Sequence, residues 1–220
     1  PYLKYLPKPG QARGIQIEHN AGRMGLRYPI EVGLQGDSKL TLQALRPLLQ
    51  YKRDRRFLKS LQREMKSWWE TMDDRSTRTD VPIKPQVVAR TLSELCDDNA
   101  IVSTDSGTIT TWMARHLIIR GDMKFSCSGN LATMAPGLPY SIAAKVAYPD
   151  RQSIAFVGDG GFSMLMADFV TAVKYDLPIK VVIIKNNVLG QIKWEQIVFL
   201  GNPEYVVDLH PIDFAKYAEA

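Results

Sequence analysis

Apolar and polar positions follow different patterns on the two sides of a polar stretch at residues 73–80. Before it, residues 14–18 alternate like a strand, and apolar residues recur at helical spacing over 38–49 and 54–72. After it, short apolar runs alternate with helical patterns. The predicted strands there are 100–104, 124–126, 153–157 and 179–185, and the predicted helices are 85–95, 108–118, 137–147, 164–175, 189–198 and one starting near Asp213.

The alternation after the polar stretch predicts an α/β fold. Its strands are apolar along their length, which favours a parallel sheet covered by helices on both faces. We expect residues 1–72 to form part of a first α/β domain, 73–83 to be a linker, and 84–220 to form the second domain. Residues 1–9 show no recognisable element, and the helix that starts near Asp213 stops about two turns later, so we expect a piece of a longer polypeptide.

Composition narrows the possible classes of protein. With 220 residues, 45% of them hydrophobic, the chain is neither disordered nor of low complexity. Two cysteines are too few for a disulfide framework, which predicts a reducing, cytoplasmic setting. The basic excess in residues 1–80 is interleaved with acids at helical spacing, which predicts a solvated helix face and no nucleic-acid partner. The alternative is a surface that attracts acidic lipid or phosphate.

Polar residues follow two of the predicted strands, where ligands of parallel sheets bind. The strand at 154–157 runs into Gly158, Asp159, Gly160 and Gly161. Glycines let the backbone turn sharply and approach a ligand, and the N–H groups of a following helix favour phosphate. The Asp159 carboxylate would repel a phosphate by itself, so the arrangement predicts a divalent cation between them.

The next strand along the chain ends at Asn186, 27 residues after Asp159. If the two strands are neighbours, the Asn186 amide oxygen lies near Asp159, and the Val188 carbonyl offers a third oxygen. With two phosphate oxygens and a water, these donors fill the six positions of Mg²⁺. Alternatively, Asp-Gly and Asn-Asn are ordinary turn dipeptides.

The residues from 158 to 166, continuing from 177 to 187, resemble the thiamine diphosphate motif. That motif is a Gly-Asp-Gly followed by a metal-binding Asn about 27 residues after the Asp. The resemblance identifies 84–220 as most of a diphosphate-binding domain and 1–72 as the latter part of the central, flavin-type domain. Many members of the family have Asn-Asn with the ligand second, whereas here Lys185 takes the first place and Asn186 the second.

The resemblance also implies roles for individual residues. Met134 corresponds to the apolar residue beneath the thiazolium ring, whereas the residue by itself, without the resemblance, favours core packing. Glu195 corresponds to an acid that faces the substrate, and the alternative is a solvated helical Glu. Glu18 corresponds to an acid that touches the flavin nucleotide. The remaining implied cofactor contacts are Ser106, Gly107, Thr108, Ala132, Thr133, Leu189 and Gly190.

Among its relatives, the sequence is most similar to pyruvate oxidase and quinone-linked pyruvate dehydrogenase. This resemblance implies oxidative decarboxylation of a 2-keto acid, pyruvate above all, with thiamine diphosphate, Mg²⁺ and FAD, and with quinone or oxygen as electron acceptor. It further implies a homodimer or tetramer, peripheral contact with the inner face of the membrane, and an isolated chain that is inactive. Acetolactate synthase, a non-oxidative keto-acid decarboxylase and a catalytically silent cofactor-binding or assembly domain are the alternatives.

Overall fold

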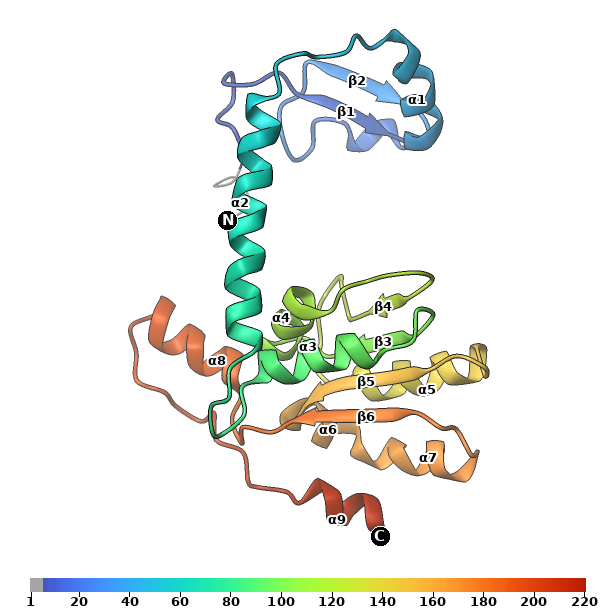
Figure 1. Cartoon of the computed structure of the whole chain (residues 1–220), viewed down its shortest axis with the longest axis vertical. Coiled ribbons are helices and arrows are strands. Elements are labelled where there is room, and N and C mark those ends of the chain that lie inside the picture. Colours follow the sequence, from blue (N-terminus) through green and yellow to red (C-terminus); the bar gives the residue numbers. More distant parts are fainter. Residues whose placement is uncertain (1–5) are drawn as a thin grey trace. The chain divides into compact units, whose positions relative to one another are not determined.

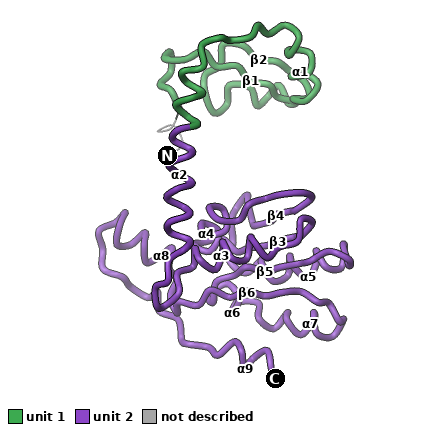
Figure 2. The backbone as a smooth tube through the Cα atoms, in the orientation of Figure 1, with its two compact units in different colours: residues 1–62 green, residues 63–220 purple. Residues whose placement is uncertain are grey.

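The computed structural model describes residues 6–220, and the chain forms two compact units that divide between residues 62 and 63 (Figure 2). The division falls inside helix α2 (Arg56–Ser76). The predicted domain limits at residues 72 and 84 therefore stay a prediction. Each unit is described by itself below.

The first unit contains a two-stranded parallel sheet of β1 (Ile15–Glu18) and β2 (Val32–Gln35). Helix α1 (Ser38–Leu45) follows, and the Asp37 carboxylate caps it by accepting a hydrogen bond of 2.9 Å from the Leu40 amide. A 3₁₀ turn containing Pro47 then ends the helix. Strand β2 was not predicted, because Gly33 breaks its short apolar pattern. No residue of this unit from 6 to 62 is buried.

Helix α2 continues beyond Met72, where the sequence predicted its end. The polar residues 73–76 were assigned to the linker, and this assignment of their secondary structure is wrong. Met72 and Ser76 are both buried, so packing within the second unit holds the last turn of the helix despite its polar sequence.

The second unit is built on a four-stranded parallel sheet in the order β4-β3-β5-β6 (Figure 1). The strands are β3 (Ile101–Thr104), β4 (Lys124–Ser126), β5 (Ser153–Gly158) and β6 (Lys180–Ile184). The helices are α3 (Pro85–Leu95), α4 (Thr108–His116), α5 (Gly137–Ala147), α6 (Asp159–Leu165), α7 (Phe169–Lys174), α8 (Gly190–Trp194) and α9 (Phe214–Glu219).

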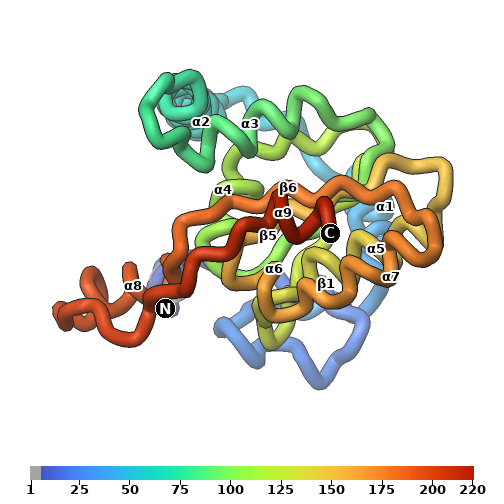
Figure 3. Tube along the Cα trace, turned by 90° about the horizontal axis from the view of Figure 1, so that it is seen from below, coloured from blue at the N-terminus to red at the C-terminus, as the bar shows by residue number. Residues whose placement is uncertain are grey.

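Alternate side chains of the central strand β5 enter two separate cores. Ile154 and Phe156 pack with residues of α3 and α4 on one face of the sheet. Ala155 and Val157 pack with residues of α5, α6, α7 and α9 on the other face (Figure 3). The predicted fold class, a parallel sheet with helices on both faces, is confirmed.

Two predicted helices differ from those in the structure. The helix predicted at 164–175 begins earlier, at Asp159, and a 3₁₀ turn separates α6 from α7. Glycines 160 and 161 hid this start, because glycine is a poor helix former. The helix predicted at 189–198 consists of α8 followed by a π-helical stretch, Glu195–Phe199. No helix within residues 6–220 combines the length and the apolar character needed to cross a membrane.

Candidate cofactor and metal site

Three strands of the second unit end at the same edge of the sheet. Thr104, at the end of β3, is in register with Phe156 of β5, and Gly158, at the end of β5, is in register with Ile184 of β6. Because the strands are parallel, the segments after them begin at this common edge. These segments contain Asp105, Asp159 and Asn186.

The Asp159 carboxylate joins two of these strand ends. Its Oδ2 atom accepts hydrogen bonds from the backbone amides of Asn186 at 3.1 Å and of Asn187 at 2.6 Å. Its Oδ1 atom accepts from the Gly160 amide at 3.0 Å, and Asp159 itself is buried. The neighbouring strands β5 and β6 therefore bring the backbone of Asn186 to the Asp159 carboxylate. The role of the Asn186 side-chain oxygen as a metal ligand stays a prediction.

The turn after β6 is held from two sides. The Asn186 side chain accepts a hydrogen bond of 3.1 Å from the Val188 amide, and Asn187 adopts a left-handed φ of 56° that suits asparagine. Residues 207–209 brace the turn from the other side. Leu189 donates to the Val207 carbonyl at 2.8 Å, and Leu209 donates to the Asn187 carbonyl at 2.9 Å. Sequence reasoning missed this brace because the segment has no periodic pattern.

Gly190 lies where two predicted cofactor segments meet. A methyl group on its Cα would lie 3.2 Å from the Asn186 amide nitrogen and 3.5 Å from the Thr108 hydroxyl. The loop at 105–108 therefore reaches the turn at 186–190. Within that loop Gly107 has a φ of 119°, which disfavours other residues although no atom crowds it.

The segment carrying Met134 packs against the same group of loops. The Ser106 amide donates a hydrogen bond of 3.2 Å to the Thr133 carbonyl. Ala132 and Ala135 on either side have left-handed φ values of 51° and 80°, a costly conformation that is common at ligand sites. A methyl group on Gly160 would lie 3.3 Å from the methyl of Met134, so Met134 lies beside the Gly-Asp-Gly turn.

Glycines 160 and 161 are required by packing within the protein. A side chain at Gly161 would overlap the Asp105 carboxylate, and one at Gly160 would crowd Leu189, Leu209 and Met134. The sequence predicted that these glycines give a ligand access to the backbone. The structure adds a second reason, because they let α6 approach the segments after β3 and β6.

The donors at this edge suit Mg²⁺. Among residues 6–220 no three His, Cys, Asp or Glu side chains gather as a metal site, so any ion here would need oxygen donors of other kinds as well. Asp159 and Asn186 offer oxygen donors, and Mg²⁺ is usually held by one or two carboxylates together with phosphate and water. The residues present therefore fit a magnesium ion bound together with a diphosphate.

Two further predicted residues form contacts of their own. Glu195 is half-buried at the start of the π-helical stretch, and its carboxylate accepts a hydrogen bond of 2.9 Å from the Gln191 side chain. No hydrogen bond or ion pair of the described residues links Glu195 to Asp159 or Asn186. Glu18 ends β1 in the first unit, where its carboxylate accepts from the Asn20 amide at 3.0 Å. The roles of both residues stay predictions.

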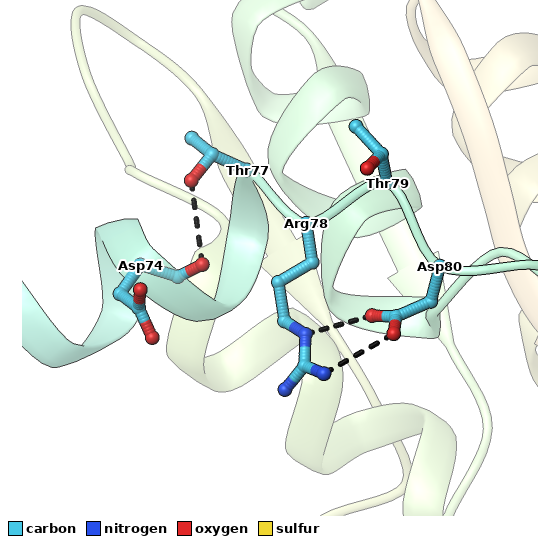
Figure 4. A pocket seen from close by; sticks show the side chains of 5 residues that line it. All are labelled: Asp74, Thr77, Arg78, Thr79 and Asp80. Atoms are coloured by element: carbon cyan, nitrogen blue, oxygen red, sulfur yellow. Dashed lines mark hydrogen bonds and ion pairs between the residues drawn. The ribbon is translucent and has the colours of Figure 1, made fainter.

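An open polar pocket lies elsewhere in the second unit and is lined by Asp74, Thr77, Arg78, Thr79 and Asp80. Figure 4 shows Arg78 turned toward Asp80, with hydrogen bonds of 2.7 and 3.1 Å between the two side chains. The pair satisfies its own charges, and none of the predicted cofactor residues lines this pocket. We therefore assign it no part in the chemistry.

The two adjacent asparagines provide a test of the metal assignment. Asn186→Ala removes an oxygen donor, and we expect it to weaken Mg²⁺-dependent binding of thiamine diphosphate by roughly 10–100-fold in the full-length protein. Asn187→Gly keeps the left-handed backbone and should leave the affinity nearly unchanged. Calorimetric titration of both variants would measure this difference, and equal losses would contradict the assignment to Asn186.

Asp105 is the most deeply buried carboxyl group at this edge, with 1% of its surface exposed. Burial raises the pKa of the Asp105 carboxyl to about 6, and hydrogen bonds from the Gly137 and Ala135 amides oppose the shift. No charged side chain contributes to it. The burial of Asp105 is not predictable from its pattern, which indicates only a turn residue after a strand.

The raised pKa predicts how stability changes with pH. Folded Asp105 binds a proton more tightly than unfolded Asp105, so its ionisation opposes folding as the pH rises from about 4 to above 6. Relative to an Asp105→Asn variant, which does not titrate, the wild type should lose up to about 3 kcal/mol across this window. Unfolding of both full-length proteins between pH 4 and 7 measures the difference, and parallel curves would rule the effect out.

Comparison with known protein families adds to this geometry. Residues 105–220 match the family model for the thiamine pyrophosphate enzyme C-terminal TPP binding domain. The whole chain aligns at 46% identity with YdaP from Bacillus subtilis, which is named as a thiamine pyrophosphate-containing protein, and covers 38% of its length. With pyruvate oxidase from Lactiplantibacillus plantarum the identity is 31%, over 93% of this chain and 34% of that protein. With the acetolactate synthase isozyme 3 large subunit from Escherichia coli the identity is 28%, over 99% of this chain and 38% of that protein.

The chain thus spans between about a third and two fifths of the length of these relatives. The family model covers more than half of the chain, and it includes the loop after β3, the Met134 segment, Asp159 and Asn186. On this match, the chain belongs to the thiamine pyrophosphate enzyme family and contains its C-terminal TPP-binding domain.

Proposed function

We propose that the full-length protein binds thiamine diphosphate through Mg²⁺ on the second unit and oxidatively decarboxylates a 2-keto acid, with pyruvate as the first candidate. The observation that carries this proposal is the Asp159 carboxylate, fixed at the end of β5 by two amides of the turn after β6. When bound, the cofactor supplies the nucleophilic carbon and accepts the electrons released by decarboxylation.

The residues of the chain hold the cofactor in this proposal. Asp159, Asn186 and the Val188 carbonyl supply oxygen ligands to Mg²⁺, which neutralises the diphosphate. Ser106, Gly107 and Thr108 donate hydrogen bonds to phosphate oxygens. The Ala132–Thr133–Met134 segment supports the thiazolium ring, and Gly158, Gly160, Gly161, Leu189 and Gly190 allow or line the approach of the cofactor.

Glu195 contacts the substrate in the same proposal. Its hydrogen bond from Gln191 restricts the carboxylate to one orientation, which a group that positions a substrate needs. The π-helical stretch that starts at Glu195 gives limited support, because such stretches are frequent at functional sites.

The electrons leave through FAD to quinone or oxygen in this proposal. The likeness to pyruvate oxidase supports this route, and Glu18 at the end of β1 would contact the flavin nucleotide. We further propose a homodimer or tetramer located in the cytoplasm or at the inner face of the membrane. Flavin absorbance of the purified full-length protein tests the FAD assignment directly.

Acetolactate synthesis is the second candidate. Identities of 31% to the pyruvate oxidase and 28% to the acetolactate synthase are too similar to separate the two activities. Both reactions use the same cofactor and metal, so the site around Asp159 serves either one. The choice depends on what happens after carbon dioxide leaves.

Product analysis of the full-length protein distinguishes the candidates. The protein would be supplied with pyruvate, thiamine diphosphate, Mg²⁺, FAD and either oxygen or a soluble quinone. Oxidative decarboxylation predicts acetate, or acetyl phosphate if phosphate is present, with one acceptor reduced by two electrons for each carbon dioxide released. Acetolactate without acceptor reduction would support the second candidate, and acetaldehyde would indicate simple decarboxylation. Cofactor binding without turnover of any 2-keto acid would indicate a silent domain.

A further inference from the structure

The Asp105 carboxyl group contacts two segments besides its own loop. Its Oδ1 atom accepts a hydrogen bond of 2.8 Å from the Gly137 amide at the start of α5. Gly137 follows Met134 by three residues. Asp105 itself lies one residue before Ser106, so its side chain ties the loop after β3 to the Met134 segment.

The other carboxyl oxygen faces the Gly-Asp-Gly turn. Any side chain at Gly161 would overlap Oδ2 of Asp105, so the first turn of α6 packs directly on this oxygen. Among the described residues, Oδ2 has no hydrogen-bond partner. A buried oxygen without a hydrogen-bond partner destabilises the folded protein, and Asp105 is present despite this cost.

Asp105 therefore joins three segments of the proposed cofactor site. They are its own loop at 105–108, the Met134 segment and the turn that begins at Asp159. We propose that Asp105 is a positioning residue, whose buried carboxyl group fixes these three segments in the arrangement that receives thiamine diphosphate. It has 1% of its surface exposed, so it acts through the segments and does not touch the ligand itself.

This inference rests on the proposed cofactor site but not on the proposed substrate. Its consequence is that removing the carboxyl group should loosen cofactor binding even at temperatures where the protein stays folded. The Met134 segment should lose its arrangement most readily, because Ala132 and Ala135 hold left-handed conformations that need support from their surroundings.

The test measures binding of thiamine diphosphate with Mg²⁺ to the full-length protein by calorimetry, well below the unfolding temperature. Asp105→Ala should raise the dissociation constant by roughly 10–100-fold, as loss of a supporting residue typically does. Asp105→Asn keeps an acceptor for the Gly137 amide and should stay within about fivefold of the wild type. If Asp105→Ala does not fold, Asp105→Cys withdraws the oxygen acceptors with little lost volume and should show the same weakening.

Ile154→Ala is the matched control. Ile154 is equally buried but lies near the start of β5 and packs in the core against α3 and α4, so it reports loss of stability alone. Its dissociation constant should stay within about twofold of the wild type. Equal affinities of Asp105→Ala and Ile154→Ala, or equal weakening by Asp105→Ala and Asp105→Asn, would overturn the positioning role while leaving the cofactor site intact. A wild-type protein that does not bind the cofactor would overturn both.

Discussion

Replacing Asp159 with alanine should weaken the binding of thiamine diphosphate and Mg²⁺ to the full-length protein by about 100-fold or more. Even changes in residues that only support a metal ligand cost roughly 10–100-fold, and Asp159 is the sole carboxylate of the proposed ligand set. The Asp159→Ala variant would hold Mg²⁺ without any carboxylate ligand, so the charge of the diphosphate would be poorly neutralised. Calorimetric titration with the cofactor, in the presence and absence of Mg²⁺, measures the loss.

Two controls separate loss of the metal ligand from loss of structure. Asp150 is an exposed acid in the same unit, and Asp150→Ala should bind the cofactor like the wild type. Asp159→Asn keeps an oxygen that can accept the backbone hydrogen bonds, so it should preserve folding better than alanine while still losing charge. Full affinity in Asp159→Asn would mean that the carboxylate holds the turn but does not bind Mg²⁺.

A single methyl group added at Gly161 should destabilise the second unit by about 1–3 kcal/mol, the usual cost of overpacking a core. The added group would overlap the Asp105 carboxylate, so α6 or the loop after β3 must move. Alanine is otherwise favoured over glycine in a helix by about 1 kcal/mol, so a net loss would show that the collision dominates. The thermal midpoint of full-length Gly161→Ala measures it.

Gly158→Ala is the control for that substitution and is used for stability only. Gly158 ends β5 with ordinary extended angles, and no atom lies within 4 Å of the position that a methyl group would take. Its midpoint should therefore stay close to the wild type. If Gly161→Ala is as stable as Gly158→Ala, then α6 does not pack on Asp105 as the structure shows.

Much of the second unit could be predicted because its pattern is local. Strands such as β5 and helices such as α3 carry periodic apolar residues bounded by turn residues, and these signals identify each element without knowledge of its neighbours. The start of α6 was missed because its first turn contains Gly160 and Gly161. The extension of α2 to Ser76 was missed because packing, which the sequence pattern does not show, holds it.

The part of the site that could be predicted consists of polar residues that directly follow the strands. The proximity of Asp159 and Asn186 follows from two neighbouring parallel strands and was expected on that condition. The brace by residues 207–209 and the burial of Asp105 could not be predicted, because both depend on contacts between segments far apart in the sequence. The roles of Glu195 and Glu18 still rest on resemblance.

The most direct test of the metal site is a crystal structure of the full-length protein with thiamine diphosphate and Mg²⁺. We expect one metal ion within about 2.1 Å of an Asp159 carboxylate oxygen and of the Asn186 side-chain oxygen, with diphosphate oxygens completing its coordination. A cofactor bound elsewhere, or a metal ion that leaves Asp159 bonded only to the backbone, would contradict the proposed site.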